Sequence, residues 1–202
     1  MVIITKIEEI HEQLVAFYPI YSDRGSATRL IYAGNDPDSQ LEGCDLRQVE
    51  SVKRALARCY AVDLRAQAKL LRDRYYRHIV LHFYLPDGRV FVPFKMRKRR
   101  VPGDSAYGYV DLERIKRLLP GDEPSIQLRS GLHLPLFSNI KTARQAYFLG
   151  MEIACDFAPP PDNSAQDLIN ALSILRELLN APTPSAKPRP PRIIRSRSIR
   201  SR

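Results

Sequence analysis

The chain has 202 residues, 44% of them hydrophobic, and a formal net charge of +10 with a pI near 9.7. This length and apolar content suit one medium-sized domain with extensions, and they exclude a chain that is disordered throughout. The charge favours a polyanionic partner, either nucleic acid or an anionic membrane surface.

The positive charge is unevenly distributed along the chain. Residues 181–202 contain one Lys, six Arg and no acidic residue, so they carry +7 and the rest of the chain carries +3. A binding face in the body must therefore be a local patch. The Pro, Ser and Arg bias of 181–202 predicts a disordered basic tail.

Cysteine usage and hydropathy indicate the cellular compartment. Cys44, Cys59 and Cys155 are widely spaced and form no zinc-binding pattern with the four histidines. Scattered thiols fit a reducing cytosol, and the N-terminus shows no signal-peptide pattern. No window approaches the roughly 18–20 apolar residues that a membrane helix requires. We expect a cytoplasmic protein with no metal ion, no organic cofactor and no membrane partner.

The first part of the chain predicts strands and then helices. Runs rich in β-branched and aromatic residues at 2–6, 14–20 and 29–32 predict strands. The Gly, Asn, Asp, Pro and Ser residues of 34–40 predict a turn. Asp45 is expected to cap a helix, with Gln48 three residues on. Steps of three and four residues place on one face of that helix Leu46, Val49, Val52, Leu56 and Cys59. We expect a second helix, or a bend, near residues 62–63.

The middle of the chain predicts two hairpins. The first joins 79–85 to 89–94 through Pro86-Asp87-Gly88, a tight-turn signal. A strand at 107–111 then leads into a predicted brief helix at 112–119. The second hairpin joins 125–129 to 132–137.

Two further helices are predicted after the hairpins. Ser138 is expected to cap a helix at 139–155, and residues 163–180 form a C-terminal helix whose stripe consists of Leu168, Leu172, Leu175 and Leu179. This stripe could cover the domain or pair with another protomer. The predicted fold is α+β, with antiparallel hairpins packed with amphipathic helices over 1–157, the helical appendage at 163–180 and the tail at 181–202.

The densest basic cluster follows the first hairpin, and its members are Lys95, Arg97, Lys98, Arg99 and Arg100. Five cations within six residues repel one another, and a polyanion would relieve that repulsion while releasing counterions. The alternative is a solvated surface loop. We expect these residues to bind a polyanion such as DNA, together with Lys141 and Arg144, which follow the predicted Ser138 cap where backbone N–H groups favour an anion.

Two other basic segments are less specific. Non-specific phosphate contacts are expected from the tail residues Arg192, Arg195, Arg197, Arg200 and Arg202, whose charge could equally serve solubility. Residues 45–77 hold nine Lys and Arg against four acidic residues. This helical region could track phosphates, or simply present a solvated face opposite a core stripe.

Catalytic motifs are scarce in this sequence. His78 and His82 lie four residues apart without a carboxylate at matching spacing, which is typical of core or surface histidines rather than metal ligands. The sequence contains no G-x-S-x-G, P-loop or H-E-x-x-H motif. We therefore expect a binding protein and not an enzyme.

Residues 14–149 present several short segments in a fixed order: AFYPI at 16–20, the helix VESVKRALARCY at 49–60, VFVPF at 90–94, YVDLERI at 109–115, IQLRSGLHLP at 126–135, and a helix containing Gln145. In this order they resemble the competence transcription factor family (ComK-like) of Gram-positive bacteria.

The resemblance implies a DNA-binding transcriptional activator that contacts A/T-rich double-stranded DNA through the minor groove as a homo-oligomer. Arg97, Arg99 and Arg100 would be the side chains that enter a narrow, strongly negative minor groove. Two alternatives remain: an RNA-binding or ribosome-associated basic protein, and a partner-binding adaptor without nucleic-acid function.

Overall fold

The computed structural model describes residues 4–23, 25–34, 39–76 and 80–157. The chain divides into two units, Met1–Pro159 and Pro160–Arg202, and the described residues belong to the first. The predicted helix at 163–180 and the predicted tail at 181–202, with its five candidate arginines, lie outside the described residues.

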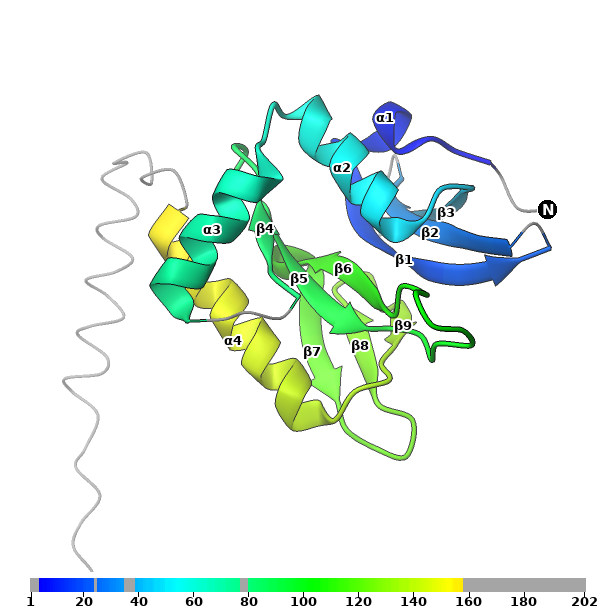
Figure 1. The fold of residues 1–202 in the computed structure, drawn as a ribbon. Coiled ribbons are helices and arrows are strands. Elements are labelled where there is room, and N and C mark those ends of the chain that lie inside the picture. Colours follow the sequence, from blue (N-terminus) through cyan, green and yellow to red (C-terminus); the bar gives the residue numbers. More distant parts are fainter. Residues whose placement is uncertain (1–3, 24, 35–38, 77–79, 158–202) are drawn as a thin grey trace, which may run out of the picture. The chain divides into compact units, whose positions relative to one another are not determined.

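A six-stranded antiparallel sheet organises the fold, in the order β3-β2-β1-β6-β5-β4 (Figure 1). Its strands are β1 Leu14–Ser22, β2 Gly25–Ala33, β3 Gln40–Asp45, β4 Phe83–Tyr84, β5 Val90–Lys95 and β6 Tyr107–Asp111. The predicted turn between β4 and β5 is present, since the Leu85 and Gly88 N–H groups donate to the carbonyls of Arg89 and Leu85. Of the strand predicted at 2–6, only residues 4–6 are described, and there Ile4 makes an isolated bridge to Cys44. The predicted α+β class is confirmed.

A second sheet of three strands corrects one prediction. It consists of β7 Ile115–Leu119, β8 Ser125–Leu128 and β9 His133–Pro135, in that order. The predicted helix at 112–119 is wrong: the Asp111 side chain accepts a bond from the Glu113 N–H and caps a single 3-10 turn, η1 Leu112–Arg114, after which the chain becomes β7. An irregularity between Ile115 and Arg117 breaks the alternation expected of a strand.

The helices are α1 Ile7–Ile10, α2 Val49–Cys59, α3 Leu64–Tyr75 and α4 Ile140–Phe157. The predicted second helix is confirmed, and Asp63 caps it by accepting from the Arg65 and Ala66 N–H groups. The prediction that Asp45 caps α2 is wrong. Gln48 holds that position, whereas Asp45 ends β3 and accepts from the backbone N–H groups of Ile7 and Arg47.

The start of α4 differs from its prediction by one residue. The Asn139 side-chain oxygen accepts from the Lys141 N–H at 2.8 Å, so Asn139 and not Ser138 provides the cap. The helix then runs beside β5 and β7 (Figure 1).

The core has two parts, one on each face of the larger sheet. Successive residues of β5 and β6 alternate between them: Phe91 and Tyr109 belong to one cluster, Val92 and Val110 to the other. The first cluster packs under α1 and α2, and the second includes the buried residues of the smaller sheet and α4. The loop between β5 and β6 therefore leaves a sheet that is covered on both faces.

Candidate nucleic-acid interface

Arg97 is the one member of the basic cluster that is buried, with 6% of its surface exposed. Its Nε and Nη2 donate to the Ser105 carbonyl at 3.0 and 2.7 Å. Its Nη1 donates to the Ile20 carbonyl at 2.9 Å and to the Ser26 hydroxyl at 3.1 Å. These hydrogen bonds provide acceptors for the N–H groups of a buried guanidinium, which would otherwise be costly to bury. The prediction that Arg97 contacts DNA is therefore corrected: its side chain joins the β5–β6 loop to the β1–β2 hairpin.

Tyr21 completes the attachment of the β5–β6 loop. The guanidinium carbons of Arg97 and Arg100 each lie 4.1 Å from the centre of its ring. The Tyr21 hydroxyl donates to the Asp104 carboxylate and accepts from the Arg100 N–H at 3.0 Å. The hydrogen bond from Tyr21 lowers the pKa of Asp104, which also accepts from the Val101 N–H. Arg97 and Ser105 thus hold the two ends of the loop together, and Asp104 holds its turn through the Arg100 and Val101 N–H groups.

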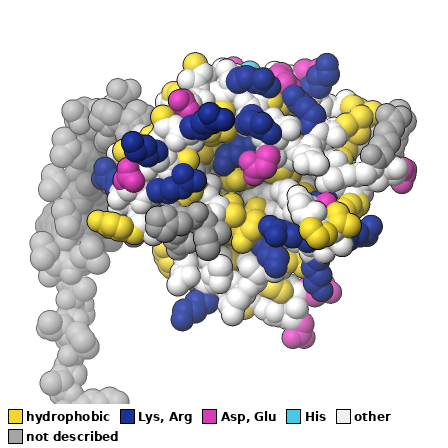
Figure 2. Space-filling view, viewed as in Figure 1, with side chains coloured by type: hydrophobic (Ala, Val, Ile, Leu, Met, Phe, Trp, Pro, Cys, Tyr) yellow, Lys and Arg dark blue, Asp and Glu magenta, His cyan; other side chains and the backbone are white. Residues whose placement is uncertain are grey.

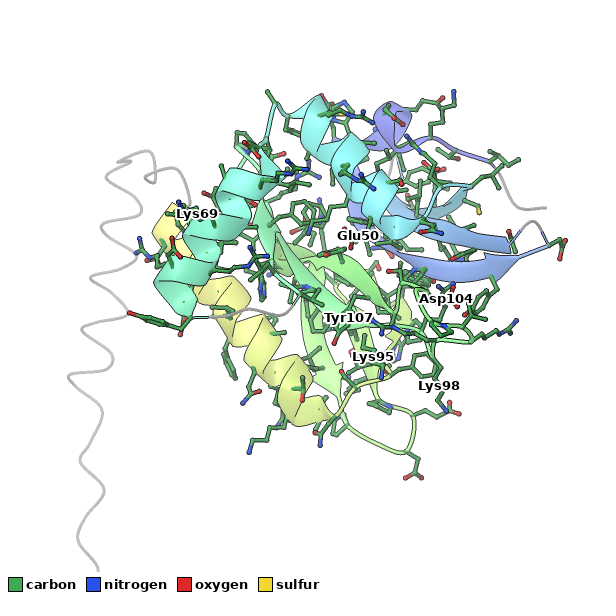
Figure 3. All side chains as sticks on the ribbon, in the orientation of Figure 1. Glu50, Lys69, Lys95, Lys98, Asp104 and Tyr107 are labelled. Atoms are coloured by element: carbon green, nitrogen blue, oxygen red, sulfur yellow. The ribbon has the colours of Figure 1, made fainter. Side chains whose placement is uncertain are left out.

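Lys98, Arg99 and Arg100 are exposed on this fastened loop. Within the described ranges, ion pairs involve only Arg29, Arg47, Arg74, Arg89 and Arg97, so these three loop cations have none. Lys95 is half-buried at the end of β5, where its carbonyl accepts from the Phe137 N–H at 2.7 Å. Figure 3 labels Lys95, Lys98 and Asp104 on this side of the molecule.

Lys98 also borders an open groove of about 890 Å3 beside β9. The other charged or titratable residues that line it are Asp122, Glu123 and His133. Two carboxylates would repel a phosphate backbone. A polyanion is therefore expected at the tip of the loop and not in this groove.

Lys141 and Arg144 are exposed on α4 but do not join the loop. The hollow that borders Lys95 is lined on the α4 side by Thr142, Ala143 and Ala146, which lie on another face of the helix. In the described part of the chain, no hydrogen bond or ion pair connects Lys141 or Arg144 to residues 95–100. The structure thus separates these two predicted sites.

The two central helices carry a second set of exposed cations: Arg54, Arg58, Arg65, Lys69 and Arg72. None of these has an ion pair within the described residues, whereas Arg47 pairs with Glu8 and Asp45, and Arg74 pairs with Asp156. On the face seen in Figure 2, Lys and Arg side chains gather over α2, α3 and the β5–β6 loop. Composition indicated this excess, but only the structure shows which cations are unpaired.

Lys53 does not belong to that surface. Its ammonium donates to the Tyr109 hydroxyl at 3.0 Å and lies 4.4 and 4.9 Å from the ring centres of Tyr109 and Phe83. Burial lowers the pKa of Lys53 to about 8 and raises that of Tyr109. A signal for this burial was present in the sequence, since Lys53 lies four residues after Val49 and three before Leu56.

The described residues show no metal centre. No group of three or more His, Cys, Asp or Glu side chains among them could hold a metal ion. His82 is buried, with its Nε2 2.7 Å from the Ala146 carbonyl oxygen. The three cysteines are unpaired. Within the same described part, no helix is long and apolar enough to cross a membrane.

Comparison with known proteins returned no relative. No family model matches the chain, and no curated protein and no solved structure matches it significantly. The description of the candidate interface therefore depends on the geometry of this chain alone.

Proposed function

We propose that this protein is a transcriptional regulator that binds double-stranded DNA, with Lys98, Arg99 and Arg100 as its principal contacts. One observation carries the proposal: three exposed cations without an ion pair among the described residues lie on a loop that Arg97, Tyr21 and Asp104 hold in place. A solvated loop does not need this attachment, whereas a binding loop benefits from it.

Attachment of the loop matters because binding costs conformational entropy. A loop that is ordered before binding loses little freedom on contact, so more of the interaction free energy appears as affinity. Neutralising phosphates with three adjacent cations also releases condensed counterions. Arginine side chains at the tip suit a narrow, A/T-rich minor groove, where the negative potential is strongest.

Two other sets of cations would act without reading sequence. The arginines and lysines of α2 and α3 that have no ion pair within the described residues would contact phosphates and increase affinity for any duplex. The Lys and Arg residues of 181–202 would act in the same way. Duplex DNA is preferred over RNA because of the resemblance to competence transcription factors, which also suggests activation at A/T-rich sites. A nucleoid-associated location in the cytoplasm follows from this proposal.

A titration with three nucleic acids tests the proposal. Fluorescence anisotropy of the full chain would be measured with an A/T-rich duplex, a G/C-rich duplex and a structured RNA over a range of salt concentrations. We expect the tightest binding to the A/T-rich duplex. Preference for the RNA would favour the RNA-binding alternative, and no binding at moderate salt would reject both nucleic-acid functions in favour of a protein partner.

A further inference from the structure

The outer face of α4 is more apolar than a solvent-facing helix surface should be. The helix buries Ala143, Ala146, Leu149, Gly150 and Ile153 on its inner side. On the opposite side, steps of three and four residues align Lys141, Arg144, Phe148, Met151 and Cys155, all of them exposed. Phe148 and Met151 are 58% and 44% exposed. Surface helices ordinarily place polar residues on that side, so this stripe lacks a covering partner among the described residues.

The stripe adjoins an ordered hollow. Phe148, Met151 and Cys155 line an open depression of about 580 Å3 together with Tyr75, which comes from the end of α3. The Tyr75 hydroxyl donates to the Asp156 carboxylate, so the two helices are tied together there. An aromatic or thioether side chain from a partner could enter this hollow without opening the core.

The charges along the stripe are self-complementary. Lys141 and Arg144 lie in the first part of α4, whereas Glu152 lies in the last part, beside Asp156, which pairs with Arg74 of its own chain. If a second α4 runs antiparallel with the two Phe148 side chains facing each other, Arg144 faces Glu152 of the second copy, because both lie four residues from the centre. Neither Arg144 nor Glu152 has an ion pair within the described residues.

We propose that this face is a symmetric dimer interface, in which a second copy of the chain packs its α4 antiparallel across the stripe centred on Phe148. A two-fold interface requires one patch that complements itself, and the stripe has both the apolar centre and the opposed charges. Its heptad-like spacing is the one that lets side chains of two helices interdigitate. The antiparallel arrangement also sets opposite helix dipoles side by side.

The interface assigns a role to Arg144 that differs from the predicted DNA contact. Arg144 would pair with a carboxylate of the second copy and not with phosphate. Dimerisation is measured without nucleic acid, so a monomeric protein would not contradict the proposed DNA binding. Likewise, a protein that binds no DNA would not contradict the proposed dimer.

Sedimentation velocity of the full chain at micromolar concentrations tests the interface. The wild type should sediment as a dimer and Phe148→Glu as a monomer. Arg144→Glu and Glu152→Arg should each weaken association by about tenfold or more, and the double swap should restore it. The matched controls Arg129→Glu and Glu113→Arg change exposed residues elsewhere and should leave association unchanged.

A disulfide test fixes the direction of the two helices. The antiparallel arrangement sets residue 141 opposite residue 155 of the second copy. In a Cys59→Ser background, Lys141→Cys should therefore form a covalent dimer under mild oxidation, and further replacement Cys155→Ser should abolish it. A monomeric wild type would overturn the proposal. A dimer whose association is unchanged by the charge swaps and that forms no disulfide between residues 141 and 155 would also overturn it.

Discussion

The guanidinium of Arg97 stacks on the ring of Tyr21 at 4.1 Å, where the β5–β6 loop meets the β1–β2 hairpin. This contact separates the five cations of residues 95–100 by role. Arg97 is buried and holds the loop, and Lys95 is half-buried at the end of β5. Lys98, Arg99 and Arg100 are exposed and have no ion pair within the described residues, although Arg100 also stacks on Tyr21. The proposed binding depends on this division, since the same positive charge on a loose loop would favour any polyanion equally.

Replacing Arg97 with Met should destabilise the fold. The substitution keeps an extended side chain but leaves the Ser105 and Ile20 carbonyls without their donors. We expect a loss of about 3 kcal/mol in the free energy of unfolding, measured by urea denaturation. Arg99→Met, on the exposed part of the loop, should change stability by less than about 0.5 kcal/mol. Equal effects of the two substitutions would contradict the structural role of Arg97.

Tyr21→Phe should loosen the loop while keeping the stacked ring. The variant lacks the hydroxyl that donates to Asp104 and accepts from the Arg100 N–H. The pKa of Asp104 is lowered in the wild type, so its carboxylate stabilises the fold at neutral pH, and this contribution is lost as the pH falls through the folded-state pKa. In Tyr21→Phe the pKa should rise toward its ordinary value, which a carboxyl-carbon NMR titration would detect. An unchanged pKa would contradict this account.

Lys53 should make stability depend on alkaline pH. Its folded-state pKa of about 8 lies below the ordinary value of 10.5, so between these values the unfolded chain binds more protons than the folded chain. Stability should therefore rise with pH across that window, by up to roughly 3 kcal/mol. Lys53→Met should remove this rise and be more stable than the wild type at pH 7.

A comparison of the two proteins isolates the contribution of Lys53, because the other titrating groups are shared. Urea denaturation at a series of pH values would measure it. The matched control is Lys69→Met on the exposed face of α3, which should retain the alkaline rise. A wild type and a Lys53→Met variant with parallel stability profiles would show that the amine is not held in a desolvated site.

Gly108→Ala should disrupt the centre of the larger sheet. A Cβ atom at this position would lie 2.7 Å from the Met96 sulfur and 2.8 Å from the Tyr18 Cα, and closer still to the Tyr18 Cβ. The Tyr18 backbone cannot move away easily, because it is part of β1. We therefore expect the free energy of unfolding to fall by about 3 kcal/mol or more, measured by thermal unfolding. Gly131→Ala, where the space is open but φ is positive, should cost less.

The sequence predicted most elements but mistook one strand for a helix. Leu112, Ile115 and Leu119 have helical spacing, and no local signal revealed that the turn capped by Asp111 would end after Arg114. Pairing of β7 with β8 decides the structure there, and the irregularity after Ile115 hides the alternation of a strand. Asp45 was misplaced for a similar reason: a carboxylate before a helix can cap it, but here the group accepts hydrogen bonds from the distant Ile7 N–H and from Arg47 two residues on.

The candidate interface was predictable as a segment but not as a set of side chains. Charge density along the chain located residues 95–100, yet Arg97 and Arg99 look alike in sequence. Their environments differ because the β1–β2 hairpin folds over one of them. Burial of Lys53 could have been inferred from helical spacing, whereas the separation of Arg144 from the loop depends on how α4 packs.

The salt dependence of binding to an A/T-rich duplex tests the central claim most directly. It would be compared between the wild type, the double variant Lys98→Gln/Arg99→Gln, and the equally charged control Lys116→Gln/Arg129→Gln. We predict that the loop variant loses its preference for A/T-rich over G/C-rich DNA and lowers the slope of log affinity against log salt by about 2. The control should keep both. Unchanged selectivity in the loop variant, or equal losses in the two variants, would contradict the assignment of the loop as the DNA-reading element.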